Sequence, residues 1–185
     1  MKSLCVRIAL VLLVLLVLLP LSRGAVFADS EEPSIESALV LYEERGRALL
    51  VVVQKEGSTP DVVARATELT ELARFLSGEF AVAYPPCGPY LGASLNVLRV
   101  LDEISVEEVE RSYHADSELP EAPNFCYHAK DLIVHPASVI VLARDDKPSA
   151  RNQMAAELLE VLAHLAALEQ LFDLADPEPS GSEGD

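Results

Sequence analysis

Apolar residues recur at helical spacing through much of the chain. One regular run follows Thr59-Pro60-Asp61, where apolar positions are separated by four, three, four and three residues. That face consists of Val62, Ala66, Leu69, Ala73 and Leu76. This spacing matches the period of an α-helix, and a hydroxyl residue followed by proline is typical of a helix start. The pattern therefore predicts a helix from Thr59 to about Gly78.

The last apolar segment is the clearest helix in the pattern. It follows Asp146 and Pro148 and carries one long stripe with the same spacing. The stripe consists of Met154, Leu158, Val161, Leu165, Leu168 and Phe172. Leu159 and Leu162 widen it, so we expect a long helix that faces the core.

The segment Ile35 to Gln54 is consistent with two structures. As a helix, it begins after a Ser34 cap and turns one apolar face inward. As a hairpin, it has a turn at Arg45-Gly46 and a strand at the β-favouring run 49–53. The helix is the preferred interpretation, and the hairpin remains open.

The middle of the chain predicts three further helical segments. Tyr90 to Ile104 carries a leucine stripe, and Ser105-Val106-Glu107-Glu108 fits a capping box that starts a short helix to about His114. Residues 115–123 are rich in proline and acidic residues and predict an irregular loop. Asn124 to Arg144 has helical character but contains Pro136, which must kink or split the helix.

Together these segments predict an all-α protein. The expected fold is an antiparallel bundle of four main helices plus one short helix, formed by residues 29–175 as a single domain. Residues 176–185 form an acidic segment with proline, glycine and serine, which we expect to be a disordered tail.

The first 28 residues have the pattern of a secretory signal peptide. Lys2 and Arg7 precede the apolar run Ile8 to Leu19, and small residues lead to an expected cleavage site after Ala28. The alternative is an uncleaved membrane anchor. Even extended to Leu21, the run has 14 residues, whereas a spanning helix needs about 20. We therefore expect an exported, periplasmic protein.

The charge of the chain limits its partners. The formal net charge is −16, and cleavage after Ala28 would remove three basic residues and no acidic one, which changes it to −19. Such a protein repels nucleic acid and anionic membrane surfaces. No second apolar run approaches membrane-spanning length, so we expect no stable membrane insertion after cleavage. The acidic surface can serve solubility alone or can attract a basic partner.

Two cysteines, Cys87 and Cys126, follow the signal peptide, and in an oxidising compartment they are expected to form a disulfide. The alternative is a redox-active or metal-binding thiol pair. Neither a C-x-x-C motif nor a usual metal-ligand spacing supports it.

The histidines do not predict a metal site. His128 and His135 share a helix face but lie seven residues apart, which separates them by about 10 Å along the axis. That is too far for one ion. We therefore expect structural roles for the histidines, His164 included, and assign no metal, with His128 and His135 as the only candidates. No cofactor is predicted: the C-x-x-C-H haem motif is missing and Met154 belongs to a core stripe.

The sequence favours binding over catalysis. The common hydrolase and nucleotide-binding motifs are missing, and acidic pairs are too numerous to be informative. The turn from Tyr84 to Tyr90 contains three prolines and could form a rigid recognition surface, although its prolines could simply separate two helices. We expect a non-catalytic protein-interaction or structural module whose partner is another envelope protein. The alternative function is a carrier or sensor of a small ligand or metal; an enzyme is the third hypothesis.

Overall fold

The computed structural model describes residues 33–145 and 147–175, which form one compact unit built of helices. The predicted signal peptide and acidic tail lie outside the described residues. The α-helices of the described part are α2 (Ile35–Gln54), α3 (Thr59–Ala83), α4 (Gly88–Ser94), α5 (Val106–Val109), α6 (Tyr127–Asp145) and α7 (Pro148–Ala175). The shorter elements are the 3-10 helices η1 (Pro85–Cys87), η2 (Leu95–Arg99) and η4 (Asn124–Cys126) and the π-helix η3 (Glu110–His114). Strands do not occur in this part, which confirms the all-α prediction.

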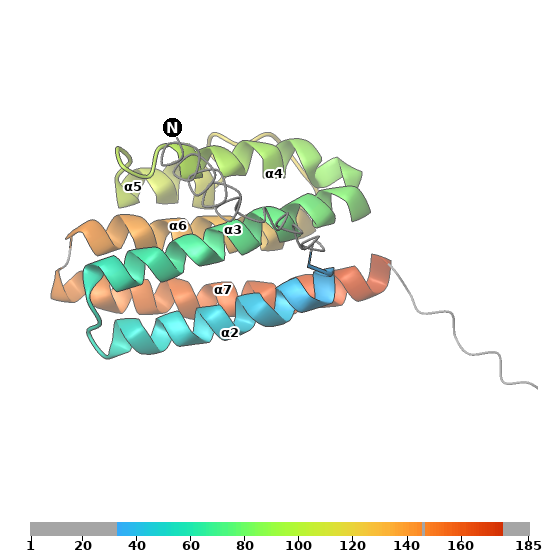
Figure 1. Cartoon of the computed structure of the whole chain (residues 1–185). Coiled ribbons are helices and arrows are strands. Elements are labelled where there is room, and N and C mark those ends of the chain that lie inside the picture. The colour runs from blue at the N-terminus through green and yellow to red at the C-terminus, as the bar shows by residue number, and fades with distance from the viewer. Residues whose placement is uncertain (1–32, 146, 176–185) are drawn as a thin grey trace, which may run out of the picture. The chain divides into compact units, whose positions relative to one another are not determined.

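The four long helices form a bundle in which each one packs against two neighbours. Helix α2 contacts α3 and α7, and α6 contacts the same two helices from the other side (Figure 1). Short connections join α2 to α3 and α6 to α7, so each of these pairs is antiparallel. The segment between α3 and α6 carries α4 and α5 across the outside of α3 and α6.

The structure decides between the two predictions for one segment and changes the boundaries of two predicted helices. The segment that could have been a hairpin is the helix α2, and the Ser34 hydroxyl caps it by accepting from the Ser37 amide. Helix α3 continues past Gly78 and ends at Ala83, with Tyr84 as its C-cap. An internal glycine costs only about 1 kcal/mol, whereas the proline after Tyr84 blocks continuation. The predicted helix from Tyr90 to Ile104 is shorter: α4 gives way to η2, in a stretch rich in the weak helix formers glycine, serine and asparagine.

Helix α6 is the central element of the fold, because every residue from 129 to 143 is buried. It runs unbroken through Pro136, so the alternative of a split helix was wrong. Proline has no amide proton for the carbonyl four residues earlier, and that carbonyl, Leu132, instead accepts a hydrogen bond of 2.7 Å from the Tyr42 hydroxyl of α2. Polar residues of α6 are thus placed inside the protein, not on its surface.

Replacement of Tyr42 with phenylalanine should test this substitute hydrogen bond. Tyr42 is fully buried, so the variant leaves the Leu132 carbonyl without a partner and should lower the free energy of unfolding by about 1–3 kcal/mol. Urea denaturation measures the change. Tyr113→Phe is the matched control, since that half-buried residue's hydroxyl makes no hydrogen bond within the described residues and its loss should change stability by less than about 0.5 kcal/mol. Equal losses in the two variants would contradict the assignment.

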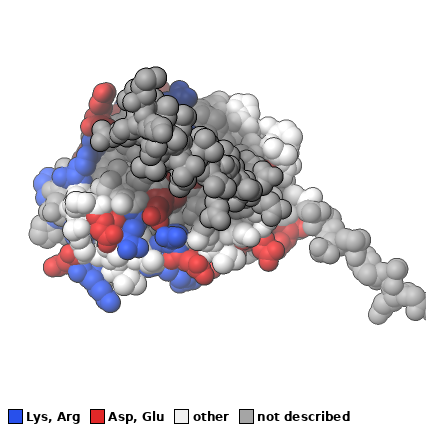
Figure 2. Space-filling model, in the orientation of Figure 1, with Lys and Arg blue, Asp and Glu red and all other residues white. Residues whose placement is uncertain are grey.

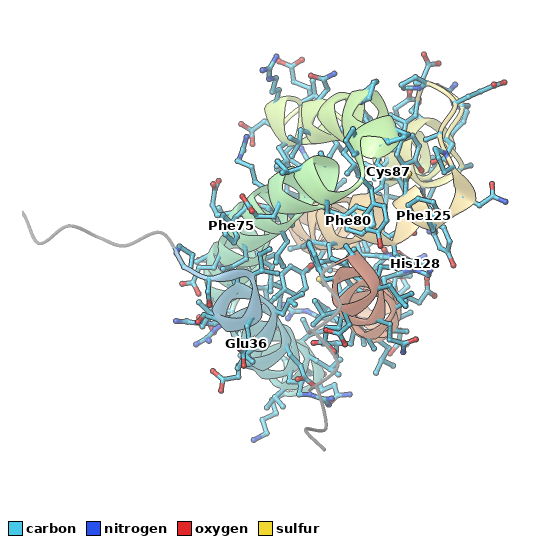
Figure 3. The ribbon with its side chains drawn as sticks, turned by 90° about the vertical axis from the view of Figure 1, so that its right-hand side faces the viewer. Glu36, Phe75, Phe80, Cys87, Phe125 and His128 are labelled. Carbon is cyan, nitrogen blue, oxygen red and sulfur yellow. A yellow bond between two sulfur atoms is a disulfide. The ribbon has the colours of Figure 1, made fainter. Side chains whose placement is uncertain are left out.

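The predicted disulfide is confirmed: Cys87 of η1 and Cys126 of η4 are bonded, with their Cα atoms 5.5 Å apart. Both residues are fully buried. Figure 3 shows Cys87 near Phe80 and Phe125 at one end of the bundle, and the two phenylalanine rings lie 6.3 Å apart. The bond closes a loop of about 40 residues, for which the chain-entropy model gives roughly 4 kcal/mol of stabilisation. It holds the segment that contains α4, α5 and η3 against the start of α6.

Acidic and basic side chains are interspersed on the described surface shown in Figure 2. Several form ion pairs, among them Arg45–Glu68 and Arg65–Asp61, both at 2.9 Å. None of the described helices is long and apolar enough to cross a bilayer.

Candidate metal centre

All four histidines of the chain lie in one cluster. The ring centroids of His114 and His135 are 5.0 Å apart, and the ring of His164 lies 5.3 Å from both His135 and His128. These residues come from three elements: η3 supplies His114, α6 supplies His128 and His135, and α7 supplies His164. Residues separated by up to 50 positions in sequence therefore share one site.

The two long helices present matching polar stripes to one another. Helix α6 carries His128, Asp131 and His135, and α7 carries Glu157, Glu160 and His164. In each stripe the residues are spaced i, i+3 and i+7, which places them on one face of the helix. Because α6 and α7 pack along each other, the two stripes meet.

His135 has the geometry of a histidine prepared to bind a metal ion. Its side chain is fully buried, and its Nδ1 lies 2.8 Å from the Glu157 carboxylate. A carboxylate partner holds the proton on Nδ1 and leaves the Nε2 lone pair available, as in many carboxylate–histidine–metal arrangements. That Nε2 has no hydrogen-bond partner in the structure. A buried nitrogen without a partner is costly unless something else binds it.

Two groups of side chains place further ligand atoms around His135. One group is Asp131, His135 and His164, and the other is His114, His135 and Glu160; within each group the ligand atoms lie within 4.8 Å of one another. Ligand atoms of a tetrahedral zinc site lie about 3.4 Å apart, given metal–nitrogen bonds of about 2.0–2.1 Å. Small side-chain rotations can therefore bring either group to bonding distance. Both groups contain His135, so the two sets of ligands overlap at this residue.

The other two histidines are held by similar contacts. His114 Nδ1 lies 2.8 Å from the Glu110 carboxylate, which leaves its Nε2 for a metal ion. His164 Nδ1 lies 3.0 Å from His128 Nδ1, and its Nε2 lies 3.4 Å from Asp131. His128 belongs to neither ligand group, so its contact positions the His164 ring.

Asp131 has a buried cationic partner, Lys130, and both side chains are about 2% exposed. The Lys130 ammonium donates to the His114 carbonyl at 2.7 Å and to Asp116 at 3.0 Å. It also lies 3.0 Å from Asp131 Oδ1 as an ion pair, yet that oxygen has no partner in hydrogen-bonding geometry. Lys130 thereby joins the segment 110–116 to α6 and balances the charge of the buried Asp131 carboxylate, whose Oδ2 faces His164.

Burial keeps part of the cluster uncharged at neutral pH. It lowers the pKa of His164 to about 4, against an opposing effect of Asp131, and it also lowers the pKa of His128. For His114, burial acts in the same direction, but the hydrogen bond to Glu110 and the charge of Asp131 outweigh it and raise the pKa. Neutral imidazole is the form that binds metal ions, so His164 is available as a ligand across the physiological pH range.

NMR titration of the metal-free protein should separate these histidines. The ring protons of His164 should titrate near pH 4, and those of His114 above the usual value of about 6.5. A lowered pKa in the folded state means that the unfolded chain binds more protons between about pH 6.5 and 4. His164 therefore makes the protein less stable as the pH falls through that range, and His164→Gln should reduce this loss. Titration of His164 near 6.5 would contradict the described burial.

The remaining candidate residues lie outside the centre. The Tyr84 hydroxyl donates to the Leu171 carbonyl at 2.7 Å, and its ring packs against Phe80 and Phe125. Tyr90 is only 4% exposed and donates to Asp116 at 2.8 Å. The Pro-rich turn therefore has its tyrosines directed inward, in packing and hydrogen bonding.

The spacing of the histidines alone predicted no shared site, and the acidic residues one turn from them were not among the candidate ligands. Asp131 and His135, and likewise Glu160 and His164, are four residues apart on a helix. That spacing places two metal ligands on one helix face. It was the one feature of the sequence that could have predicted these pairs. His114 carried no such signal, because only the folded segment brings it to the cluster.

No family model, curated protein or solved structure matches this chain. Its function must therefore be inferred from the site itself.

Proposed function

We propose that the protein binds one divalent transition-metal ion at the histidine cluster and acts as a metal carrier or sensor in the cell envelope. The observation that carries this proposal is the Nε2 atom of His135, which is fully buried and has no hydrogen-bond partner. Asp131 and His164 in one group, and His114 and Glu160 in the other, each offer a ligand atom within 4.8 Å of a ring nitrogen of His135. A bound ion would satisfy this nitrogen and would also offset the negative charge of the nearby carboxylates.

The donor set indicates which ions fit. Imidazole nitrogens and carboxylate oxygens suit Zn²⁺, Cu²⁺, Ni²⁺ and Fe²⁺, whereas Mg²⁺ and Ca²⁺ prefer sites made of oxygen alone. Both cysteines of the described part are in the disulfide, so no thiolate is present there to select Cu⁺. Zn²⁺ is the most suitable first probe because it accepts a tetrahedral nitrogen and oxygen shell.

Calorimetry with Zn²⁺ on protein treated with a chelator tests the proposal. We expect one equivalent to bind, with release of protons as the ligands lose them. Co²⁺ should bind at the same site and give the visible absorption of a tetrahedral complex, and Zn²⁺ should remove that absorption. Weak binding of several ions, or binding that excess Mg²⁺ abolishes, would indicate only attraction to the acidic surface and would contradict the proposal.

A further inference from the structure

A second candidate site lies beside the metal centre, in the segment that the disulfide closes. It is a cavity of about 570 Å³ between the 116–124 loop, α4 and the start of α6. Pockets that hold small molecules commonly measure about 300–1,000 Å³. We call it the Tyr90/Tyr127 cavity, after the two aromatic residues in its wall. It does not contain the atoms of the two ligand groups around His135.

The charge of the Tyr90/Tyr127 cavity is negative. Asp116 and Glu121 line it, and none of its described lining residues is basic. The buried Lys130, about 2% exposed, donates a hydrogen bond to Asp116 but does not itself line the cavity. Of the two carboxylates in the wall, only Asp116 already has a cationic partner. The cavity therefore favours a cation over an anion.

The walls of the cavity suit an organic cation better than a bare metal ion. Tyr127 is 39% exposed, and its ring packs 4.0 Å from the His128 ring and 5.3 Å from the His164 ring. An aromatic face attracts an ammonium group through cation–π interaction. Leu119, Pro120 and Pro123 supply apolar surface for the rest of a ligand. Imidazoles are not part of the wall, so it lacks the nitrogen ligands of the metal centre.

The cavity is also fixed in shape before any ligand binds. The Tyr90 hydroxyl donates to Asp116, and Lys130 donates to the same carboxylate oxygen. On the opposite side, the loop ends in Pro123 and η4, where Cys126 is bonded to Cys87. A wall that is ordered in advance loses little conformational entropy on binding.

We propose that the Tyr90/Tyr127 cavity binds a small amphipathic primary amine. Its ammonium group lies among Asp116, Glu121 and the ring of Tyr127, and its apolar part lies against Leu119 and Pro120. The proposal does not rest on metal binding, because it uses other side chains. The two sites are nevertheless adjacent, since Tyr127 packs on His128 and His164 and since Lys130 bridges Asp116 and Asp131.

The test compares 2-phenylethylamine with 2-phenylethanol, which has a similar shape but no charge. With the full mature chain, free of metal, we expect saturable binding of one amine per protein by calorimetry and much weaker binding of the alcohol. Amide NMR shifts should concentrate in residues 116–127. Higher salt should weaken amine binding, because charge attraction contributes to it.

Three variants locate the amine. Tyr127→Ala and Glu121→Gln change exposed residues and should each weaken binding about five- to thirtyfold. Glu103→Gln is the matched control, because Glu103 lines a different cavity beside Arg144; it should have no effect. Equal binding of the alcohol, no saturable binding of the amine, or unchanged affinity in Tyr127→Ala would each overturn the proposal. Zinc binding in the same variants is a separate measurement, so the failure of one site does not decide the other.

Discussion

Replacement of His135 with glutamine should weaken Zn²⁺ binding by at least about 100-fold. His135 belongs to both candidate ligand groups and supplies the only buried imidazole nitrogen in the described residues that lacks a hydrogen-bond partner. Glutamine keeps a polar side chain of similar length but cannot supply an imidazole nitrogen. Calorimetric competition against a chelator of known affinity measures the loss, and far-UV circular dichroism checks that the helices remain.

Two further variants rank the roles within the cluster. Glu157→Gln keeps His135 but weakens the hydrogen bond to its Nδ1, so zinc affinity should fall by about 10–100-fold. His128→Gln is the control: it removes an imidazole that touches His164 but belongs to neither ligand group. Its effect should be about tenfold or less. If His128→Gln and His135→Gln cause equal losses, the cluster does not bind zinc through His135. If His135→Gln does not fold, Glu157→Gln and the exposed ligand variant Glu160→Gln still test the site.

Replacement of Lys130 with methionine should lower the free energy of unfolding by about 3–5 kcal/mol. The variant keeps much of the side-chain volume but removes the charge, so buried Asp131 loses its cation. It also breaks the hydrogen bonds to Asp116 and to the His114 carbonyl, which connect the segment 110–116 to α6. Urea denaturation of metal-free protein measures the loss.

An exposed lysine gives the matched control for Lys130. Lys55→Met removes the same charge at the surface end of α2, and we expect a change within about 0.5 kcal/mol. Combining Lys130→Met with Asp131→Asn should restore part of the stability, because no uncompensated buried carboxylate remains. A small effect of Lys130→Met, equal to that of Lys55→Met, would show that the buried ion pair does not stabilise this fold.

The apolar periodicity was enough to predict the class of fold and most of the long helices. In α3 and α7 the main predicted apolar stripes are buried, because a continuous apolar stripe can only be removed from water by packing. The expectation that Leu159 widens the α7 stripe was wrong: Leu159 is 57% exposed, because it lies outside the face that packs on the bundle. The pairing of Cys87 with Cys126 also followed from the sequence, since only two cysteines lie beyond the predicted signal peptide. Periodicity gave the wrong limit at Gly78, because the tertiary packing of Phe80 keeps the end of α3 helical.

The candidate metal centre could be predicted only in part. The pairs Asp131 with His135 and Glu160 with His164 are local, so their spacing is readable in the sequence. Whether the two stripes face each other, or face solvent, depends on how α6 and α7 rotate about their axes. That rotation is set by the packing of the whole bundle and not by either segment alone.

Local periodicity and the number of cysteines were sufficient to predict most of the long helices, their main apolar stripes and the covalent loop, because none of these depends on how the helices pack. The tertiary structure alone decided that α6 is buried on all sides, because this requires α3, α7 and the 84–126 segment to cover it together. Because α6 is buried, the polar atoms of Lys130, Asp131 and His135 are removed from water and must find partners within the protein. In water, these side chains would be ordinary polar residues. Inside the bundle, each needs a partner, and the Nε2 of His135, which has no hydrogen-bond partner among the described residues, is the atom on which the proposed metal site rests.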